Sequence, residues 1–148
     1  MQERFSTFTL LIAKLSKAIR KIKTEEMSQF NLKSPHVSCL YYLHKQGELT
    51  ATKLCDICNE DKAAVSRTID YLEKHGYLYC DSNARKRYNS PLKLTEMGES
   101  VAVEICGKID RILGVASQGL SEEDREIMYK CLAVISKNLT KVCQNYGD

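Results

Sequence analysis

The segment from Asp61 to Gly76 constrains this chain most, because it predicts a helix with a defined start, end and buried face. The Asp61 carboxylate can accept hydrogen bonds from the N–H groups that follow, and Gly76 can adopt the left-handed conformation that ends a helix. Val65, Ile69 and Leu72 recur at spacings of four and three, which predicts one buried stripe. The opposite surface is small, hydroxylated and positive, and carries Lys62, Ala63, Ser66 and Arg67. Such a face at a helix N-terminus, where the peptide dipoles favour phosphate, suits a DNA major groove.

The residues just before this segment predict a shorter helix, capped by Thr50 and ending near Asn59. Its expected inner face is formed by Leu54, Ile57 and Cys58, packed on the longer helix across a tight turn. Two short helices joined this closely form the helix-turn-helix pattern.

A basic hairpin is expected next. Residues 77–80 form a short apolar strand, residues 92–94 are its expected partner, and the loop between them contains the adjacent cations Arg85, Lys86 and Arg87. A charge run is most often only a solvated loop. Directly after a recognition helix, however, it predicts a DNA-binding wing.

Residues 2–27 predict a long amphipathic helix. Its apolar residues alternate spacings of three and four, at Phe5, Phe8, Ile12, Leu15, Ile19 and Ile22. A stripe of this regularity needs a partner helix. Packing inside one domain and binding to a membrane surface are the alternatives. Because the helix-turn-helix needs little of this surface, we favour a partner from a second subunit.

Three further helix starts are predicted by capping residues. Ser34 caps and Pro35 opens a helix that ends at Gly47, Thr95 caps a long helix after the hairpin, and Ser121 caps the last one. The last two helices carry apolar stripes of their own. Together with the first helix, they form a helical layer away from the DNA-binding residues.

The chain contains 7 cysteines, of which only Cys55 and Cys58 are closely spaced. No second such pair accompanies them, so we expect neither a metal nor a cofactor. The cysteines on or near apolar stripes are Cys39, Cys106, Cys131 and Cys143. We therefore expect thiols that act as small hydrophobic side chains. Redox sensing at Cys55 or Cys80 is the alternative.

Length and composition leave one domain as the simplest organisation, since the chain has 148 residues and a net charge of only +3. No apolar run approaches the length that spans a membrane, and no signal peptide is indicated, so we expect a cytoplasmic protein. No nucleophile elbow, phosphate loop or zinc-helix motif is present, so we do not expect an enzyme.

From about Leu32 to Ser100 the chain resembles the MarR family of winged-helix transcriptional regulators. The matching features are, in order, the helix from Pro35 to Gly47, Gly47-Glu48-Leu49-Thr50, Ala64-Val65-Ser66-Arg67 with Ile69, Leu72 and Glu73, Gly76-Tyr77-Leu78, and Leu94-Thr95-Glu96-Met97-Gly98. The resemblance implies a mainly α fold with a small β-wing. It places one MarR-like domain over residues 1–148, with a winged helix-turn-helix region at 32–98 and dimerisation helices at 1–30 and 99–148.

The resemblance also implies a sequence-specific regulator, which we expect to be a repressor that binds an inverted-repeat operator of double-stranded DNA as a homodimer. The expected DNA contacts come from both helices and the wing: Thr52, Lys53, Lys62, Ala63, Ser66, Arg67, Arg85, Lys86 and Arg87. The chain departs from the family in the wing. Many members carry Asp-x-Arg there, whereas this chain has Lys86 and Tyr88 at those positions.

Family members commonly respond to small phenolic or lipophilic ligands, or to thiol oxidation, so the resemblance implies a small-molecule effector. His36, Tyr41 and Tyr42 are candidates for lining a ligand pocket, although core packing is the commoner role of such aromatic residues. Two alternatives to a ligand-modulated repressor remain. One is a thiol-based redox-sensing regulator, and the other is a winged helix that binds only proteins.

Overall fold

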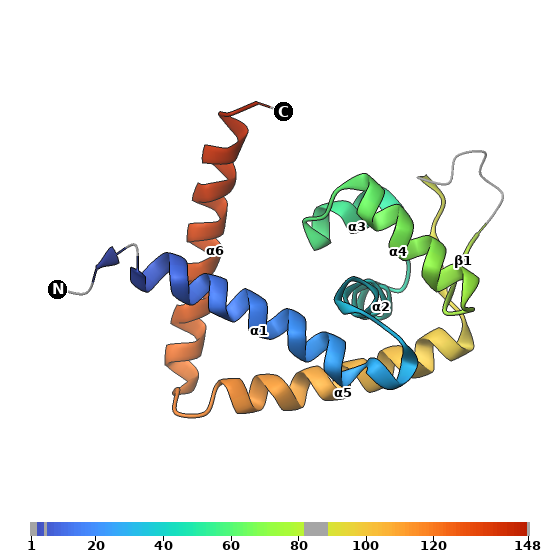
Figure 1. Ribbon diagram of the computed structural model, residues 1–148, viewed down its shortest axis with the longest axis horizontal. Helices are drawn as coiled ribbons and strands as arrows, with labels where there is room; N and C mark the ends of the chain where they lie inside the picture. The colour runs from blue at the N-terminus through green and yellow to red at the C-terminus, as the bar shows by residue number, and fades with distance from the viewer. Residues whose placement is uncertain (1–2, 5, 82–88, 148) are drawn as a thin grey trace. The chain divides into compact units, whose positions relative to one another are not determined.

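The computed structural model describes residues 3–4, 6–81 and 89–147, and it confirms a mainly α fold with a small β-hairpin (Figure 1). The chain divides into two compact units, Met1–Ile109 and Asp110–Asp148. The boundary falls inside helix α5, which spans Glu96–Ala116. Each unit is described by itself.

The first unit opens with a π-helical turn over Ser6–Leu10 that runs into helix α1, Leu11–Glu26. The single helix expected over residues 2–27 is therefore not α-helical throughout. Helix α1 packs on helix α2, which spans Ser34–Gln46. The Lys23 ammonium of α1 donates a hydrogen bond to the Ser38 hydroxyl of α2 over 2.9 Å.

The start of α2 differs from the expectation by one residue. Ser34 was expected to cap this helix, but it is the first helical residue, and Lys33 occupies the cap position in an extended conformation. The His36 ring explains the shift, because its Nδ1 accepts a hydrogen bond from the Lys33 N–H over 2.9 Å. A side chain from the first turn thus satisfies a donor at the helix start.

The helix-turn-helix forms as predicted, from α3 at Ala51–Cys58 and α4 at Lys62–Lys74. The Thr50 hydroxyl accepts from the Lys53 N–H over 3.2 Å, and the Asp61 carboxylate accepts from the Ala64 N–H over 2.7 Å. Asn59 lies between the helices with a φ of +51°. Asparagine tolerates this left-handed conformation, so the chain can reverse within a short turn.

The wing begins as an antiparallel pair of strands, β1 at Leu78–Cys80 and β2 at Leu92–Leu94. Leu78 lies opposite Leu94, and Cys80 lies opposite Leu92. Leu92 also exchanges two backbone hydrogen bonds with Leu49, of 2.8 and 3.3 Å. This bridge was not predicted, and it ties the base of the hairpin to the residue just before the helix-turn-helix.

The core of the first unit lies among α2, α3, α4 and the hairpin, where the helices each contribute an apolar stripe. The predicted stripe of α4 is buried, with Val65, Ile69 and Leu72 exposed by 6%, 2% and 0%. On α3, Leu54 is buried, while Ile57 and Cys58 are only half-buried. The recognition helix is therefore held from its inner side, and its outer side is left to solvent.

The second unit consists of the end of α5 and helix α6, Glu122–Gln144. The predicted cap is present, because the Ser121 hydroxyl accepts from the Asp124 N–H over 3.0 Å and the Asp124 carboxylate accepts from the Ser121 N–H over 3.3 Å. No residue of α6 in the described part of the chain is buried. Across the described residues, no helix combines the length and apolar character needed to cross a membrane.

Candidate DNA-binding surface

The outer face of α4 presents the residues predicted for base and phosphate contacts. Lys62, Ala63 and Arg67 are exposed and Ser66 is half-exposed, all within the first two turns after the Asp61 cap. Their backbone is fixed from behind by the buried stripe of the same helix. The face is therefore basic and is backed by the buried stripe of the helix, and its small Ala63 and Ser66 side chains let the helix approach a groove closely.

The two residues predicted on the preceding helix lie beside this face. Thr52 and Lys53 are exposed in the first turn of α3, and α3 packs directly on α4. The Lys53 backbone N–H is engaged by the Thr50 cap, whereas its side chain extends into solvent. The structure thus brings together the predicted contacts from both helices.

The wing residues Arg85, Lys86 and Arg87 lie outside the described residues, so their predicted contacts stay predictions. At the base of the wing, Lys93 of β2 lies 3.3 Å from the Asp81 carboxylate and 3.6 Å from Glu48. The hydrogen bond to Asp81 and the charges of both carboxylates raise the Lys93 pKa. The sequence pattern did not show this charged cluster, because its members come from separate segments.

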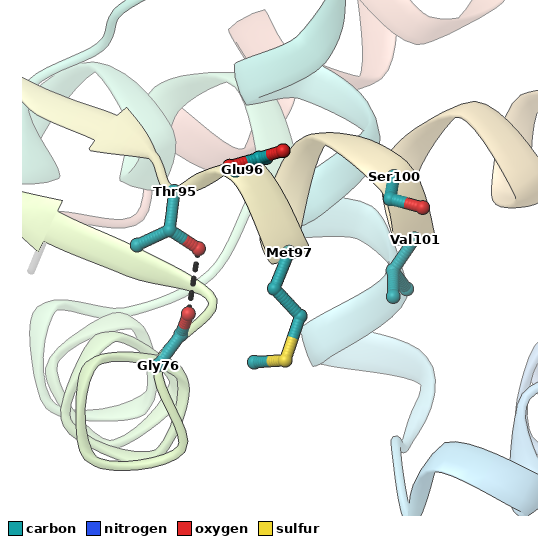
Figure 2. A pocket seen from close by; sticks show the side chains of 6 residues that line it. All are labelled: Gly76, Thr95, Glu96, Met97, Ser100 and Val101. Atoms are coloured by element: carbon teal, nitrogen blue, oxygen red, sulfur yellow. Dashed lines mark hydrogen bonds between the residues drawn. The ribbon is translucent and has the colours of Figure 1, made fainter.

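Thr95 joins the end of the recognition helix to the start of α5 (Figure 2). Its hydroxyl donates to the Gly76 carbonyl over 2.6 Å and accepts from the Gly98 N–H over 3.0 Å. A shallow hollow of about 650 Å³, wide open to solvent, surrounds this joint and is lined by Gly76, Thr95, Glu96, Met97, Ser100 and Val101. Sequence analysis predicted the Thr95 cap but not its bond back to Gly76, which depends on tertiary structure.

The described cysteines occupy different environments. Cys39 is buried, Cys55, Cys58, Cys80 and Cys106 are half-buried, and Cys131 and Cys143 are exposed. Burial raises the pKa of the Cys39 thiol to about 12, and burial together with Glu60 raises that of Cys58. Because the thiolate is the reactive form, both sites favour packing over redox chemistry. Among the described residues, no group of three potential ligands is arranged for a metal ion.

The aromatic residues proposed for a ligand pocket pack in two separate ways. Tyr41 and Tyr42 are half-buried against the core, with their rings edge to face at a centroid distance of 5.2 Å. His36 instead stacks on Tyr71 of the recognition helix. The structure does not bring the three side chains together as one lining.

Comparison with known proteins agrees with this geometry. Residues 30–87 match the model of the MarR family, which covers the helix-turn-helix and the start of the wing.

Three solved structures illustrate the likeness of the whole chain. A putative MarR family transcriptional regulator from Listeria monocytogenes, complexed with 26mer DNA, has 23% identity and a TM-score of 0.86, over 100% of this chain and 97% of that one. The S. aureus MepR–DNA complex has 22% identity and a TM-score of 0.80, over 93% and 99%. NMB1585, a MarR family regulator from Neisseria meningitidis, has 16% identity and a TM-score of 0.82, over 97% and 99%. At these identities the likeness establishes the fold.

Proposed function

We propose that this chain, a member of the MarR family by its match over residues 30–87 and by its fold, is a transcriptional regulator that binds double-stranded DNA sequence-specifically. The observation that carries the proposal is the exposed basic face on the first two turns of α4. A module that only contacts proteins does not need such a face. Two structures of the same fold are complexes with DNA.

In this proposal, Ser66 and Arg67 of α4 face the bases. Lys62 and Ala63, at the start of α4, lie at the entrance of the major groove. Thr52 and Lys53 of α3 contact phosphate. Arg is the residue that most often reads guanine, through two parallel hydrogen bonds in the major groove. The wing cations Arg85, Lys86 and Arg87 hold the backbone or enter the minor groove, where narrow A/T-rich segments attract Arg.

We further propose that the protein acts as a cytoplasmic, non-enzymatic homodimer on an inverted repeat. What supports a dimer is the apolar stripe of α1, where Ile12, Leu15 and Ile19 are exposed by 42%, 57% and 54%. Helix α6 adds Ile127, Leu139 and Val142, exposed by 52%, 49% and 46%. Isolated apolar residues on a surface are ordinary, but an apolar stripe along the length of a helix marks an interaction surface, and each of these helices carries one. A two-fold dimer places its recognition helices on half-sites roughly 10 bp apart.

The regulatory part of the proposal is a repressor that is released by a small molecule. A dimer bound to the operator blocks the polymerase physically. The two recognition helices of the dimer can adopt different spacings, and a ligand that binds one spacing better shifts the population toward it. The Thr95 joint supports such coupling, because it links the exit of α4 directly to α5.

The proposal is tested by DNA selection followed by binding. Sites are selected from a random duplex library, and affinities for the selected and random duplexes are measured by fluorescence anisotropy at about 50 and 200 mM salt. We expect Arg67→Ala to lose about 1 to 3 kcal/mol of binding to the selected site and to relax one base position.

Lys74→Ala is the matched control, because it removes one exposed cation from the opposite end of the same helix. It should leave the preference for the selected site unchanged. If both variants weaken all duplexes equally, α4 supplies only charge and the base-reading role is wrong. If the wild type binds no DNA even at low salt, the chain is a protein-contact module.

A further inference from the structure

Three aromatic rings form a continuous stack between α2 and the recognition helix. His36, in the first turn of α2, lies on Tyr71 of α4 with centroids 4.1 Å apart and planes at 11°. Tyr71 in turn lies on His75, the residue that ends α4, at 4.0 Å and 26°. The stack therefore supports the last turn of the recognition helix from the side of the scaffold.

Hydrogen bonds fasten the middle ring and one end of this stack. The Tyr71 hydroxyl donates to the Asn31 carbonyl over 2.6 Å. His75 Nδ1 lies 2.7 Å from the carbonyl oxygen of Tyr71 and must donate to it, because a carbonyl only accepts. The segment before α2 and the end of α4 are thus connected through three side chains.

The protonation state of His36 follows from its partner. His36 Nδ1 accepts the Lys33 backbone N–H, which can only donate, so Nδ1 carries no proton and the ring is neutral. Protonation would place a second N–H against this donor. The ring would lose its hydrogen bond to Lys33, and α2 would lose the acceptor at its start.

The charged groups near His36 disfavour its protonated form. They are Lys33 from the segment before α2 and His75 from α4, whereas Tyr71 faces the ring as a neutral stacking partner. Burial, followed by the charges of Lys33 and His75, lowers the His36 pKa from 6.5.

We propose that the His36–Tyr71–His75 stack is a pH-responsive support of the recognition helix, which weakens specific DNA binding as the protein is acidified. Protonation of His36 breaks its bond to Lys33 and places an imidazolium ring against Tyr71. The contact between α2 and the last turn of α4 then loosens, and the base-reading face is no longer held in one orientation.

The direction of this effect is opposite to simple electrostatics. Protonating histidines adds positive charge to the protein, which by itself tightens binding to the DNA polyanion. A loss of affinity in acid therefore identifies a structural effect. Because the loss involves roughly one hydrogen bond, we expect about a three- to tenfold weaker Kd between about pH 7.5 and 5.5.

The test compares wild type with His36→Asn at constant ionic strength, using a duplex selected from a random library. Asparagine can still accept from the Lys33 N–H but cannot be protonated in this range. We expect the affinity of His36→Asn for the selected duplex to stay level or to rise in acid, while the affinity of the wild type falls. His36→Gln serves as a second non-titrating variant should the asparagine variant fold poorly.

His44→Asn is the matched control. His44 lies 2.6 Å from the Glu99 carboxylate and outside the stack. Its removal should leave the acid weakening in place. The proposal is overturned if wild-type affinity rises or stays level in acid, or if His44→Asn, rather than the His36 variants, abolishes the loss.

This inference rests on the proposed DNA-binding function, and a measurement without DNA separates the two. Because the His36 pKa is lower in the folded protein than its ordinary value of 6.5, its contribution to stability is present above pH 6.5 and is lost as the pH falls through the folded value. Thermal unfolding of the full chain should show a decline below pH 6.5 that is smaller in His36→Asn. If that decline in stability is present but no duplex is selected, the DNA-binding proposal fails, while the structural role of the stack is supported. An equal decline in both proteins overturns the role of His36.

Discussion

At Gly98 the backbone of α5 lies close against the backbone of Tyr77. A Cβ placed there would lie 1.8 Å from the Tyr77 carbonyl oxygen, well inside contact distance. The same close packing lets the Thr95 hydroxyl accept a hydrogen bond from the Gly98 N–H and donate one to the Gly76 carbonyl. The family resemblance included this glycine as part of a motif, and the structure supplies its physical reason.

We expect Gly98→Ala to destabilise the protein by about 1 to 3 kcal/mol or more, because the backbone of Tyr77 must move to admit the methyl group. Gly107→Ala, in the same helix, is the control. Nothing lies within 4 Å of its added Cβ, so it should stabilise by about 0.5 to 1 kcal/mol through helix propensity. Urea unfolding of both variants measures the difference, and a destabilisation of similar size in both would rule out the clash.

At the scale of the element, local capping accounts for where most helices begin. Four predicted cap residues each accept a hydrogen bond from the backbone N–H three residues later. They are Thr50, Asp61, Thr95 and Ser121. Ser34 is the exception. There the His36 ring takes the donor at the helix start, so the helix begins one residue earlier.

The recognition helix offers the clearest test of this capping. We expect Asp61→Ala to lower the free energy of unfolding by about 1 kcal/mol, since the Ala64 N–H loses its acceptor. Asp61→Asn retains an acceptor and should stay close to wild type. Non-specific DNA binding should not weaken in either variant, because each removes a negative charge near phosphate. Equal loss of stability in both variants would point to charge rather than to the cap.

At the scale of the whole molecule, the exposed stripes of α1 and α6 need a partner surface. Helix α1 packs on α2, yet none of its residues is buried. Ile12 and Ile22, at the two ends of its apolar stripe, are exposed by 42% and 36%. The sequence predicted this stripe and its partner helix, and the dimer stays a proposal.

We expect Leu15→Lys to weaken the dimer by about 3 to 6 kcal/mol, because a two-fold interface loses the burial of the leucine twice. Ala13→Lys adds the same charge on the other side of α1 and should leave the assembly intact. Sedimentation at several concentrations measures both. A Leu15→Lys protein with the wild-type association constant would contradict a dimer through this stripe.

The starts of α3, α4, α5 and α6, the buried stripe of α4 and the basic face on its other side were determined by sequence. These features depend on hydrogen bonds between residues three or four positions apart and on helical periodicity. A short stretch of chain therefore contains all the interactions that produce them. For the same reason the candidate residues on α3 and α4 were predictable without the fold.

Only the tertiary structure decided four contacts between distant segments. They are the Leu49–Leu92 bridge, the hydrogen bond from Thr95 to Gly76, the Lys93 cluster and the His36–Tyr71–His75 stack. Each joins groups from segments far apart in the chain, and no periodicity or spacing relates them. A histidine at the start of a helix looks the same in sequence whether its ring faces a ligand, the core or the recognition helix. Only the folded chain, by placing Tyr71 against that ring, decides which it is.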